Sequence, residues 1–149
     1  MIKKILIPLD GSRLAENAIP YAEEIATKFK AQLVLIQVLQ PRLMMPEYEP
    51  GFYDEAIKIE HDTAKIYLHG LKDRIGYFHI PVETAVLDGG TVAGTIIDHA
   101  KEAGIDLIVM NTHGRSGIDR WFYGSVADKV LQQAHCPVLL VRGGPGEKL

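Results

Sequence analysis

Five short runs of apolar residues, each separated from the next by a segment of helical spacing, constrain the fold of this chain most strongly. The runs are continuous rather than alternating with polar residues, which is typical of strands buried on both faces of a parallel sheet. The segments between them repeat apolar residues every three or four positions, which indicates amphipathic helices. We therefore expect a doubly wound α/β domain with a five-stranded parallel sheet. The expected strands cover residues 2–9, 33–39, 82–87, 106–110 and 137–141.

Four helices are expected between these strands. The first contains Pro20, which should kink it because proline lacks the N–H that an interior helix position needs. The second follows an irregular loop at 40–51 that contains three prolines. The predicted boundaries are Ser12 and Thr91 as N-caps, Gly76 and Gly104 as helix stops, and about 125–135 for the last helix.

Composition restricts the class of protein. With 149 residues, of which 47% are hydrophobic, the chain fits one globular domain, expected over 1–143 with a flexible tail at 144–149. The formal charge of -3 argues against a protein that binds nucleic acid through phosphate contacts. No apolar run approaches the length of a membrane span, so no membrane association is expected.

The amino terminus and the single cysteine indicate a cytoplasmic protein. The first apolar stretch is interrupted by Pro8 and followed by Asp10, which makes it too short for a signal-peptide core. Cys136 has no partner for an intrachain disulfide, which fits a reducing compartment. It precedes an apolar strand, so a buried and inert thiol is expected.

Two of the strand ends are followed by residues suited to ligand binding. In doubly wound folds, ligands bind beyond the carboxyl ends of the strands, at the point where the strand order reverses. Residues 8–12 follow this pattern, and so does the glycine-containing segment 111–117, after which a further glycine and a serine begin a helix. Glycines allow close backbone approach, and a helix N-terminus attracts anions. The segment therefore predicts a phosphate cradle.

Common phosphate and nucleic-acid motifs do not explain this segment. It contains neither the Gly-Lys-Ser/Thr triplet of a Walker A loop nor the G-x-G-x-x-G dinucleotide fingerprint. Residues 114–117 match the four-residue loop of KH RNA-binding domains. That loop joins two helices, whereas this one follows a strand, and the chain is acidic, so we do not expect RNA binding.

The whole chain resembles the universal stress protein family. The resemblance rests on KKILIPLDGS at the start, DLIVM before the loop, THGRSG within it and HCPVLLVR at the end. The ATP-binding branch of that family has Gly, two residues, Gly, nine residues, Gly and then Ser or Thr. Gly114, nine residues and Gly124-Ser125 match the last part of this motif, whereas Asn111 occupies the position of its first glycine.

The resemblance implies a sheet of order 3-2-1-4-5, an adenine nucleotide alpha-hydrolase-like fold, and a site for ATP or another adenine nucleotide such as AMP or ADP. It implies that Asp10 contacts the adenine–ribose end and that Val38 packs on the base. In relatives a Mg²⁺ or Mn²⁺ ion often accompanies the triphosphate, held by its phosphates rather than by protein ligands. The implied nucleotide-binding residues are Pro8, Leu9, Asp10, Val38, Met110, Asn111, Thr112, His113, Gly114, Arg115, Ser116, Gly117, Gly124, Ser125 and Val126.

Several of these residues have a structural explanation beside the ligand-binding one. Asp10 is also suited to starting the turn into the first helix. His113 is expected to be a hydrogen-bonded loop histidine rather than a general base. Ser125 is expected to cap the last helix, with Asp128 completing a capping box, although the same hydroxyl could face a phosphate. The side chain of Asn111 occupies space that a closely approaching nucleotide would use.

The expected function is a nucleotide-binding stress sensor or regulatory module, because no general base for hydrolysis is evident. Asn111 favours the alternative of a dimeric stress-protein scaffold that does not bind ATP, and a slow ATP-hydrolysing enzyme is the third reading. The family resemblance also implies a homodimer, formed by antiparallel pairing of edge strand 137–142 with its copy. The downstream protein partner is not indicated by the sequence.

Overall fold

The computed structural model describes residues 1–41, 49–76, 79–113 and 124–143. Within these ranges the chain forms five strands and five helices, in the alternating order that the sequence predicts. Their bounds are β1 (Lys4–Leu9), α1 (Arg13–Glu16), α2 (Ile19–Phe29), β2 (Gln32–Leu39), α3 (Pro50–Gly76), β3 (Val82–Asp88), α4 (Val92–Glu102), β4 (Leu107–Asn111), α5 (Ser125–Gln133) and β5 (Val138–Val141).

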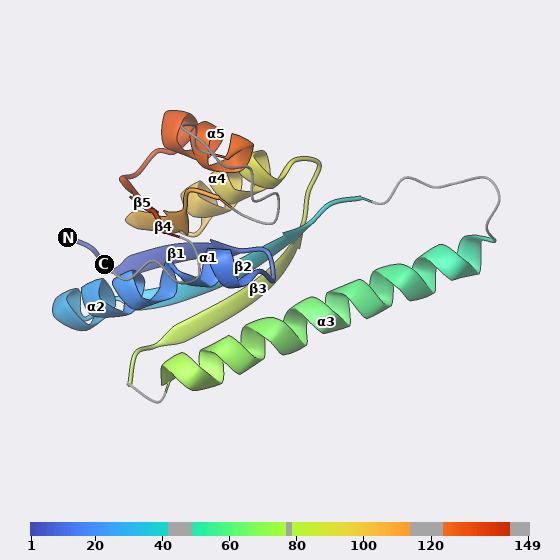
Figure 1. Ribbon diagram of the computed structural model, residues 1–149, viewed down its shortest axis with the longest axis horizontal. Coiled ribbons are helices and arrows are strands. Elements are labelled where there is room, and N and C mark those ends of the chain that lie inside the picture. The colour runs from blue at the N-terminus through green and yellow to red at the C-terminus, as the bar shows by residue number, and fades with distance from the viewer. Residues whose placement is uncertain (42–48, 77–78, 114–123, 144–149) are drawn as a thin grey trace.

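The strands form one sheet of order β3-β2-β1-β4-β5, as expected (Figure 1). Every neighbouring pair is parallel, with Leu9 beside Gln37 at the carboxyl end of β1 and β2. The chain proceeds from β1 towards β3 and then returns to place β4 on the other side of β1. The strand order therefore reverses between β1 and β4, so the ends of these two strands lie next to each other.

Helices cover both faces of the sheet, which explains why the strands are apolar throughout. On one face, α1, α2 and α3 pack on residues such as Ile7 and Leu35. On the other face, α4 and α5 pack on residues such as Leu6 and Ile36 (Figure 1). Successive strand residues point to opposite faces, so each strand contributes to both cores.

The first helical segment differs from the single kinked helix that was expected. It is interrupted after Glu16, and α2 starts at Ile19 with Pro20 in its first turn. The first residues of a helix need no intrahelical acceptor for their N–H groups, so proline is tolerated there and a new helix begins. The described chain consequently has five helices rather than four.

Other predicted helix boundaries are confirmed. The Ser12 side chain accepts a hydrogen bond from the backbone N–H of Ala15 at 3.2 Å. The Thr91 side chain accepts one from Gly94 N–H at 3.2 Å. Gly104, which follows the C-cap residue Ala103 of α4, has a φ of 65°, a conformation that favours glycine. Helix α3 ends at Gly76, which the sequence predicted as a helix stop.

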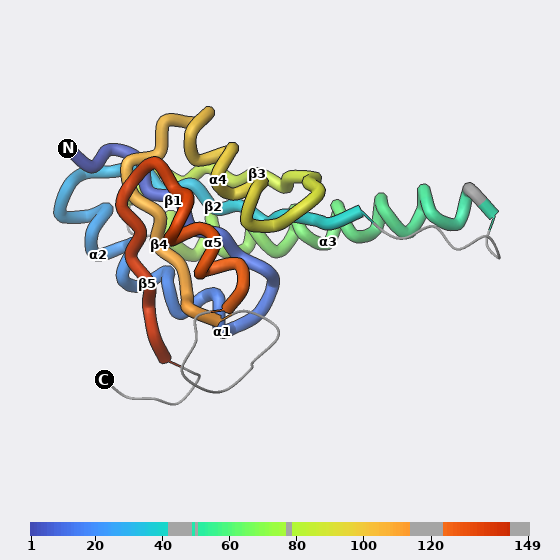
Figure 2. Tube along the Cα trace, turned by 90° about the horizontal axis from the view of Figure 1, so that it is seen from above, coloured from blue at the N-terminus to red at the C-terminus, as the bar shows by residue number. Residues whose placement is uncertain are grey.

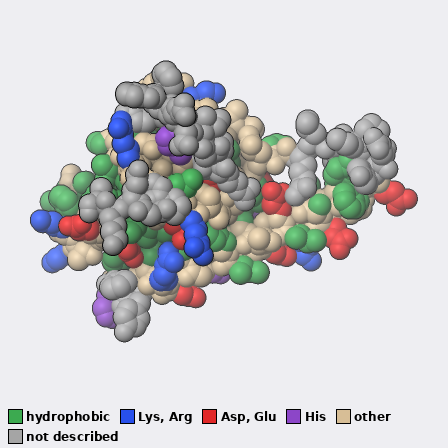
Figure 3. All heavy atoms as spheres, in the orientation of Figure 1, with side chains coloured by type: hydrophobic (Ala, Val, Ile, Leu, Met, Phe, Trp, Pro, Cys, Tyr) green, Lys and Arg blue, Asp and Glu red, His purple; other side chains and the backbone are tan. Residues whose placement is uncertain are grey.

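Helix α3, with 27 residues, is the longest element, and its amino-terminal part extends beyond the rest of the domain (Figure 2). Hydrophobic and acidic side chains lie side by side on this projecting part (Figure 3). Within the described ranges, no helix is long and apolar enough to cross a membrane.

Cys136 lies just before β5. It is half-buried, whereas a buried thiol was expected. Burial raises the pKa of its thiol, so the reactive thiolate is disfavoured at neutral pH. The expectation of an inert thiol is therefore supported.

Candidate functional site

A cavity of about 360 Å³ lies where the strand order reverses, beyond the carboxyl ends of β1 and β4. The start of α5 lies beside these ends, and α4 and β2 complete the lining. Eleven residues that the sequence analysis assigned to nucleotide binding line this one cavity: Pro8, Leu9, Asp10, Val38, Met110, Asn111, Thr112, His113, Gly124, Ser125 and Val126. The other four, Gly114, Arg115, Ser116 and Gly117, lie outside the described residues.

Five residues of the lining were not predicted from the sequence. Val92 and Ile96 come from α4, where their helical spacing was interpreted only as a core-facing stripe. The same stripe reaches the cavity because both residues lie in the first half of α4, on the side that packs on the sheet. The complete set of missed residues is Ala15, Gln40, Val92, Ile96 and Ala127.

Asp10 follows β1 and performs the turn function that was considered for it. Its Oδ1 accepts hydrogen bonds from the backbone N–H of Ser12 at 2.9 Å and from the Ser12 hydroxyl at 2.5 Å. These bonds hold the carboxylate at the mouth of the cavity and position Ser12 to cap α1. The turn function and a ligand-binding function are therefore compatible in the same side chain.

Asn111 ends β4 and its side chain is 6% exposed. Its Oδ1 accepts a hydrogen bond from the His113 backbone N–H at 3.0 Å. Its Nδ2 donates to the Gly143 carbonyl oxygen at 3.4 Å, beyond the end of β5. The amide of Asn111 therefore stabilises the first turn after β4 and occupies one N–H group that a phosphate could otherwise use.

Thr112 and Gly124 join the two halves of the site. The Thr112 N–H donates to the Val141 carbonyl at 2.9 Å, and the Gly124 N–H donates to the Thr112 carbonyl at 2.8 Å. A Cβ added at Gly124 would lie 3.0 Å from the Thr112 carbonyl oxygen, so a larger residue fits only if the two backbone segments move apart by a few tenths of an ångström. Glycine at this position therefore suits the close approach of the two segments.

His113 is hydrogen-bonded, as the sequence analysis expected. Its Nδ1 lies 3.0 Å from the Thr112 hydroxyl oxygen. The ring is half-buried and is the only basic side chain that the described lining contributes.

The expectation that Ser125 caps α5 is wrong. Gly124 is the N-cap residue, and Ser125 is the first helical residue, with an exposed side chain and no capping hydrogen bond. The capping box is absent as well, because the Asp128 Oδ2 accepts from the Gln132 Nε2 at 3.0 Å instead. The hydroxyl of Ser125 at the cavity is therefore not occupied by the capping bond that had been expected.

The charge around the cavity is divided between its two ends. The Asp10 carboxylate lies at the end of β1, whereas the N-terminus of α5 presents partial positive charge beside β4. The first N–H groups of a helix have no acceptor within the helix, so they are suited to anions. Val38, Met110 and Val126 provide apolar surface between these ends. The arrangement is suited to a ligand with a largely apolar group and an anionic group.

Comparison with known proteins identifies relatives over nearly the whole chain. The model of the Universal stress protein family matches residues 1–142. A universal stress protein of Thermus aquaticus is 35% identical over 144 residues, covering 95% of this chain and all of that protein. One from Methanocaldococcus jannaschii is 32% identical over 142 residues, covering 95% of this chain and 83% of that protein.

Solved structures show the same fold. The universal stress protein UspA from Lactobacillus plantarum superposes with a TM-score of 0.83 at 27% identity, covering 94% of this chain and 97% of that one. Two more distant structures contain nucleotides. A universal stress protein from Archaeoglobus fulgidus, in complex with dAMP, has a TM-score of 0.63 at 20% identity, with coverage of 94% and 97%. A family protein from Arabidopsis thaliana with AMP bound has a TM-score of 0.65 at 17% identity, with coverage of 95% and 92%.

Proposed function

The chain belongs to the universal stress protein family, and we propose that it binds adenine nucleotides in the cavity between β1, β4 and α5. One observation carries this proposal: eleven of the residues that the sequence assigns to nucleotide binding line one cavity at the reversal of strand order. Its volume of about 360 Å³ lies within the ordinary range of small-ligand pockets. The same fold holds dAMP and AMP in the two distant structures, which supports the ligand class.

The two ends of the cavity suggest how the nucleotide lies in it. The base would pack on Val38 and Met110, and Asp10 would accept hydrogen bonds from the adenine–ribose end. The phosphates would approach the N-terminus of α5, where backbone N–H groups and the exposed Ser125 hydroxyl are suited to donate.

ATP, with its accompanying Mg²⁺ or Mn²⁺, is the ligand we propose within this class, with AMP and ADP as the smaller members. Among the described residues, no three His, Cys, Asp or Glu side chains come together as a metal site. A divalent cation would therefore be held chiefly by phosphate oxygens, so the protein's own contribution would be to position those phosphates.

Binding and signalling, rather than turnover, is the function that we propose. The only histidine in the described lining is hydrogen-bonded to its neighbour Thr112, and we expect any turnover of ATP to be slow. Regulation would follow from the difference between the empty and nucleotide-bound surfaces, recognised by a downstream protein in the cytoplasm.

A dimeric scaffold without ATP binding is the second candidate. The hydrogen bond from the His113 backbone N–H to the Asn111 side chain favours this scaffold, because the N–H group already has an acceptor before any phosphate arrives. Both candidate functions are compatible with a dimer, because β5 lies at the edge of the sheet and an exposed sheet edge can pair with another strand. We propose that β5 pairs antiparallel with its copy to form a homodimer.

Titration calorimetry on nucleotide-free protein separates the two candidates. We expect AMP and ATP to bind, and the variant Val126→Phe, which fills part of the cavity, to weaken binding at least about tenfold. Leu131→Phe, at an exposed position on the same helix, is the matched control and should bind like the parent. Absence of nucleotide binding in the parent protein, with and without Mg²⁺, would favour the scaffold.

A further inference from the structure

Helix α3 carries a second apolar stripe besides the one that packs on the sheet. The packing stripe runs from Ala64 to Ile75 and is buried. The second stripe, which we call the outer stripe, lies roughly a third of a turn away around the helix axis. Its spacing of four, three, four, three and four residues is that of a coiled-coil seam. Large and small residues alternate along it: Phe52, Ala56, Ile59, Thr63, Ile66 and Gly70.

The large residues of the outer stripe are exposed to solvent. The exposed fractions are 56% for Phe52, 59% for Ile59 and 74% for Ile66. Apart from Met1, Ile66 is the most exposed large hydrophobic side chain among the described residues. Large apolar side chains exposed at every seventh position of one helix indicate a surface that another helix covers.

Gly70, the last residue of the outer stripe, is not required by the packing of this domain. It lies in the interior of α3, and a Cβ added to it would meet nothing within 4 Å. Its φ is not positive, so its backbone conformation does not need glycine either. Glycine inside a helix lowers stability relative to alanine. The close approach of another chain explains a glycine that contacts within the described part of this chain do not.

The outer stripe is complementary to itself when two copies of α3 run antiparallel. We place a two-fold axis at the level of residue 61, where each large residue faces a small residue of the other copy. The pairs are Ile59 with the partner's Thr63, Ile66 with the partner's Ala56, and Phe52 with the partner's Gly70. Two-fold symmetry makes every pair occur twice. A parallel arrangement would set glycine against glycine and leave gaps, which lose packing contacts.

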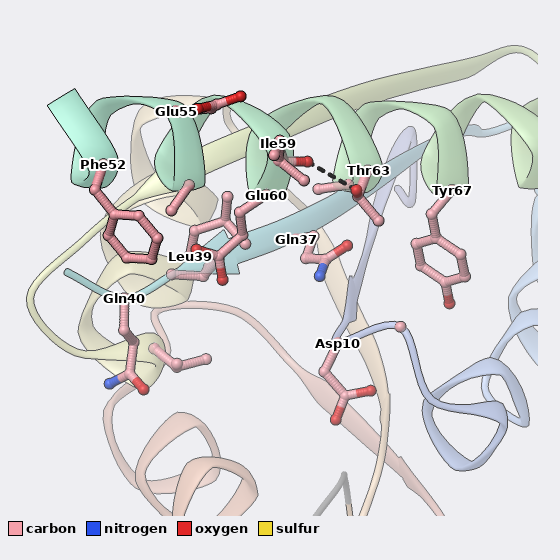
Figure 4. A pocket seen from close by; sticks show the side chains of 15 residues that line it. Asp10, Gln37, Leu39, Gln40, Phe52, Glu55, Ile59, Glu60, Thr63 and Tyr67 are labelled. Atoms are coloured by element: carbon pink, nitrogen blue, oxygen red, sulfur yellow. Dashed lines mark hydrogen bonds between the residues drawn. The ribbon is translucent and has the colours of Figure 1, made fainter. Parts of the chain in front are cut away.

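A cavity of about 830 Å³ borders the outer stripe, between α3 and the carboxyl ends of β1 and β2 (Figure 4). Phe52, Ala56, Ile59 and Thr63 belong to its lining. The antiparallel arrangement sets the partner's Ile66 against Ala56, at the edge of this cavity. The cavity therefore offers space to the most exposed isoleucine of the second copy.

We propose that the outer stripe is a self-association surface, on which a second copy of this chain docks its own α3 in antiparallel orientation. The seam has six residues in each copy, fewer than a standard interface, so the dissociation constant should be about 0.1–1 mM. Helix α3 packs beside β3, at the sheet edge opposite β5. The surface is therefore separate from the pairing proposed for β5, and it does not depend on nucleotide binding.

Sedimentation equilibrium of Leu139→Lys, which removes pairing through β5, tests the proposal. This protein should be monomeric at about 10 µM and mostly dimeric at about 2 mM. Adding Ile66→Lys should weaken self-association at least about tenfold. Ile57→Lys is the matched control, because Ile57 is an exposed isoleucine of α3 outside the outer stripe. A protein that stays monomeric at the higher concentration, or equal effects of the two substitutions, would overturn the proposal.

Gly70→Leu separates association from folding. Leucine favours the helix more than glycine does and has open space at this position, so the melting temperature should not fall. Self-association should nevertheless weaken at least about tenfold, because the leucine fills the place of the partner's Phe52. His69→Leu adds the same side chain at an exposed position outside the outer stripe and should associate like the parent. Unchanged association of Gly70→Leu would contradict the proposed pairing.

Disulfide formation tests the antiparallel register. In a Cys136→Ser background, Ile59→Cys and Thr63→Cys are prepared as separate proteins. Because Ile59 faces the partner's Thr63, a mixture of the two should oxidise to the mixed disulfide faster than either protein alone forms its own disulfide. Faster linkage of either protein to itself would show a parallel or unspecific contact and would overturn the antiparallel pairing. Both variants should still bind AMP, since neither residue lines the nucleotide cavity.

Discussion

The Asn111 side chain accepts a hydrogen bond from the His113 backbone N–H at 3.0 Å, across the first turn after β4. This hydrogen bond is made by the residue that departs from the family motif, in which a glycine occupies the position of Asn111. The side chain replaces the freedom of glycine with a fixed turn, and it uses a donor that lies at the proposed phosphate end. A substitution that removes this hydrogen bond should therefore lower the stability of the turn and raise the affinity for nucleotide.

Asn111→Gly tests this opposition. The variant loses both side-chain hydrogen bonds and gains backbone freedom in the unfolded state, so its free energy of unfolding should fall by about 1–2 kcal/mol. The freed His113 N–H should raise affinity for ATP severalfold. Urea unfolding and calorimetry measure the two effects.

Asn17→Ala is the control for that experiment. Asn17 Nδ2 also donates to the Gly143 carbonyl, at 3.0 Å, but Asn17 does not line the cavity. It should lose stability without any gain in affinity. A folded Asn111→Gly protein that binds ATP no better than its parent would contradict the function assigned to Asn111.

Two serines at helix starts should respond differently to alanine. Ser12→Ala removes the cap of α1 and a partner of Asp10, and it should lower the free energy of unfolding by about 1 kcal/mol. Ser125→Ala removes no capping bond and should change stability by less than about 0.5 kcal/mol. Nucleotide affinity should nevertheless fall in Ser125→Ala, because its hydroxyl lies at the proposed phosphate end. Equal losses of stability in the two variants would show that Ser125 does cap α5.

Asp106 should make stability depend on pH in the acid range. Its Oδ2 accepts hydrogen bonds from the backbone N–H groups of Lys3, at 2.8 Å, and Lys4, at 3.0 Å. These bonds lower the pKa of the carboxyl group in the folded protein. The stabilisation is therefore fully present above the unfolded pKa of about 3.9 and is lost as the pH falls through the folded value.

Asp106→Asn should remove this contribution. The difference in free energy of unfolding between parent and variant should be below about 1 kcal/mol at pH 7, because solvent screens the group, and should shrink towards zero below about pH 4. Asp98→Asn, an exposed position on α4, provides the control. A difference that grows on acidification would contradict the assignment.

The dimer proposed through β5 should be sensitive to charge at the sheet edge. Leu139 on this edge strand is 36% exposed, and Leu139→Lys should convert a dimer into a monomer by light scattering at micromolar concentration. Leu131→Lys, at the exposed Leu131 of α5, should remain dimeric. A parent protein that is already monomeric at this concentration would exclude the dimer.

The sequence pattern predicted the convergence of two strand ends because parallel strands place their carboxyl ends at one edge, whereas the sheet order was implied by the family resemblance. It could not predict that Asn111 contacts Gly143, since that contact joins segments brought together only by β5. It also misplaced the cap of α5, because Ser125 is a favoured capping type but Gly124 makes the closer approach to Thr112. The polar Gln37 within the apolar run 33–39 also indicated that the end of β2 lies beside a cavity, and this signal was not used.

A methyl-resolved NMR titration with AMP tests the central proposal most directly. Nucleotide in the cavity should shift the methyl signals of Met110 and Val126, which lie on different elements and both line the cavity. The signals of Leu131 and Leu139, outside the cavity, should remain in place. Unchanged Met110 and Val126 signals at saturating AMP, or shifts confined to the two outer leucines, would contradict the site.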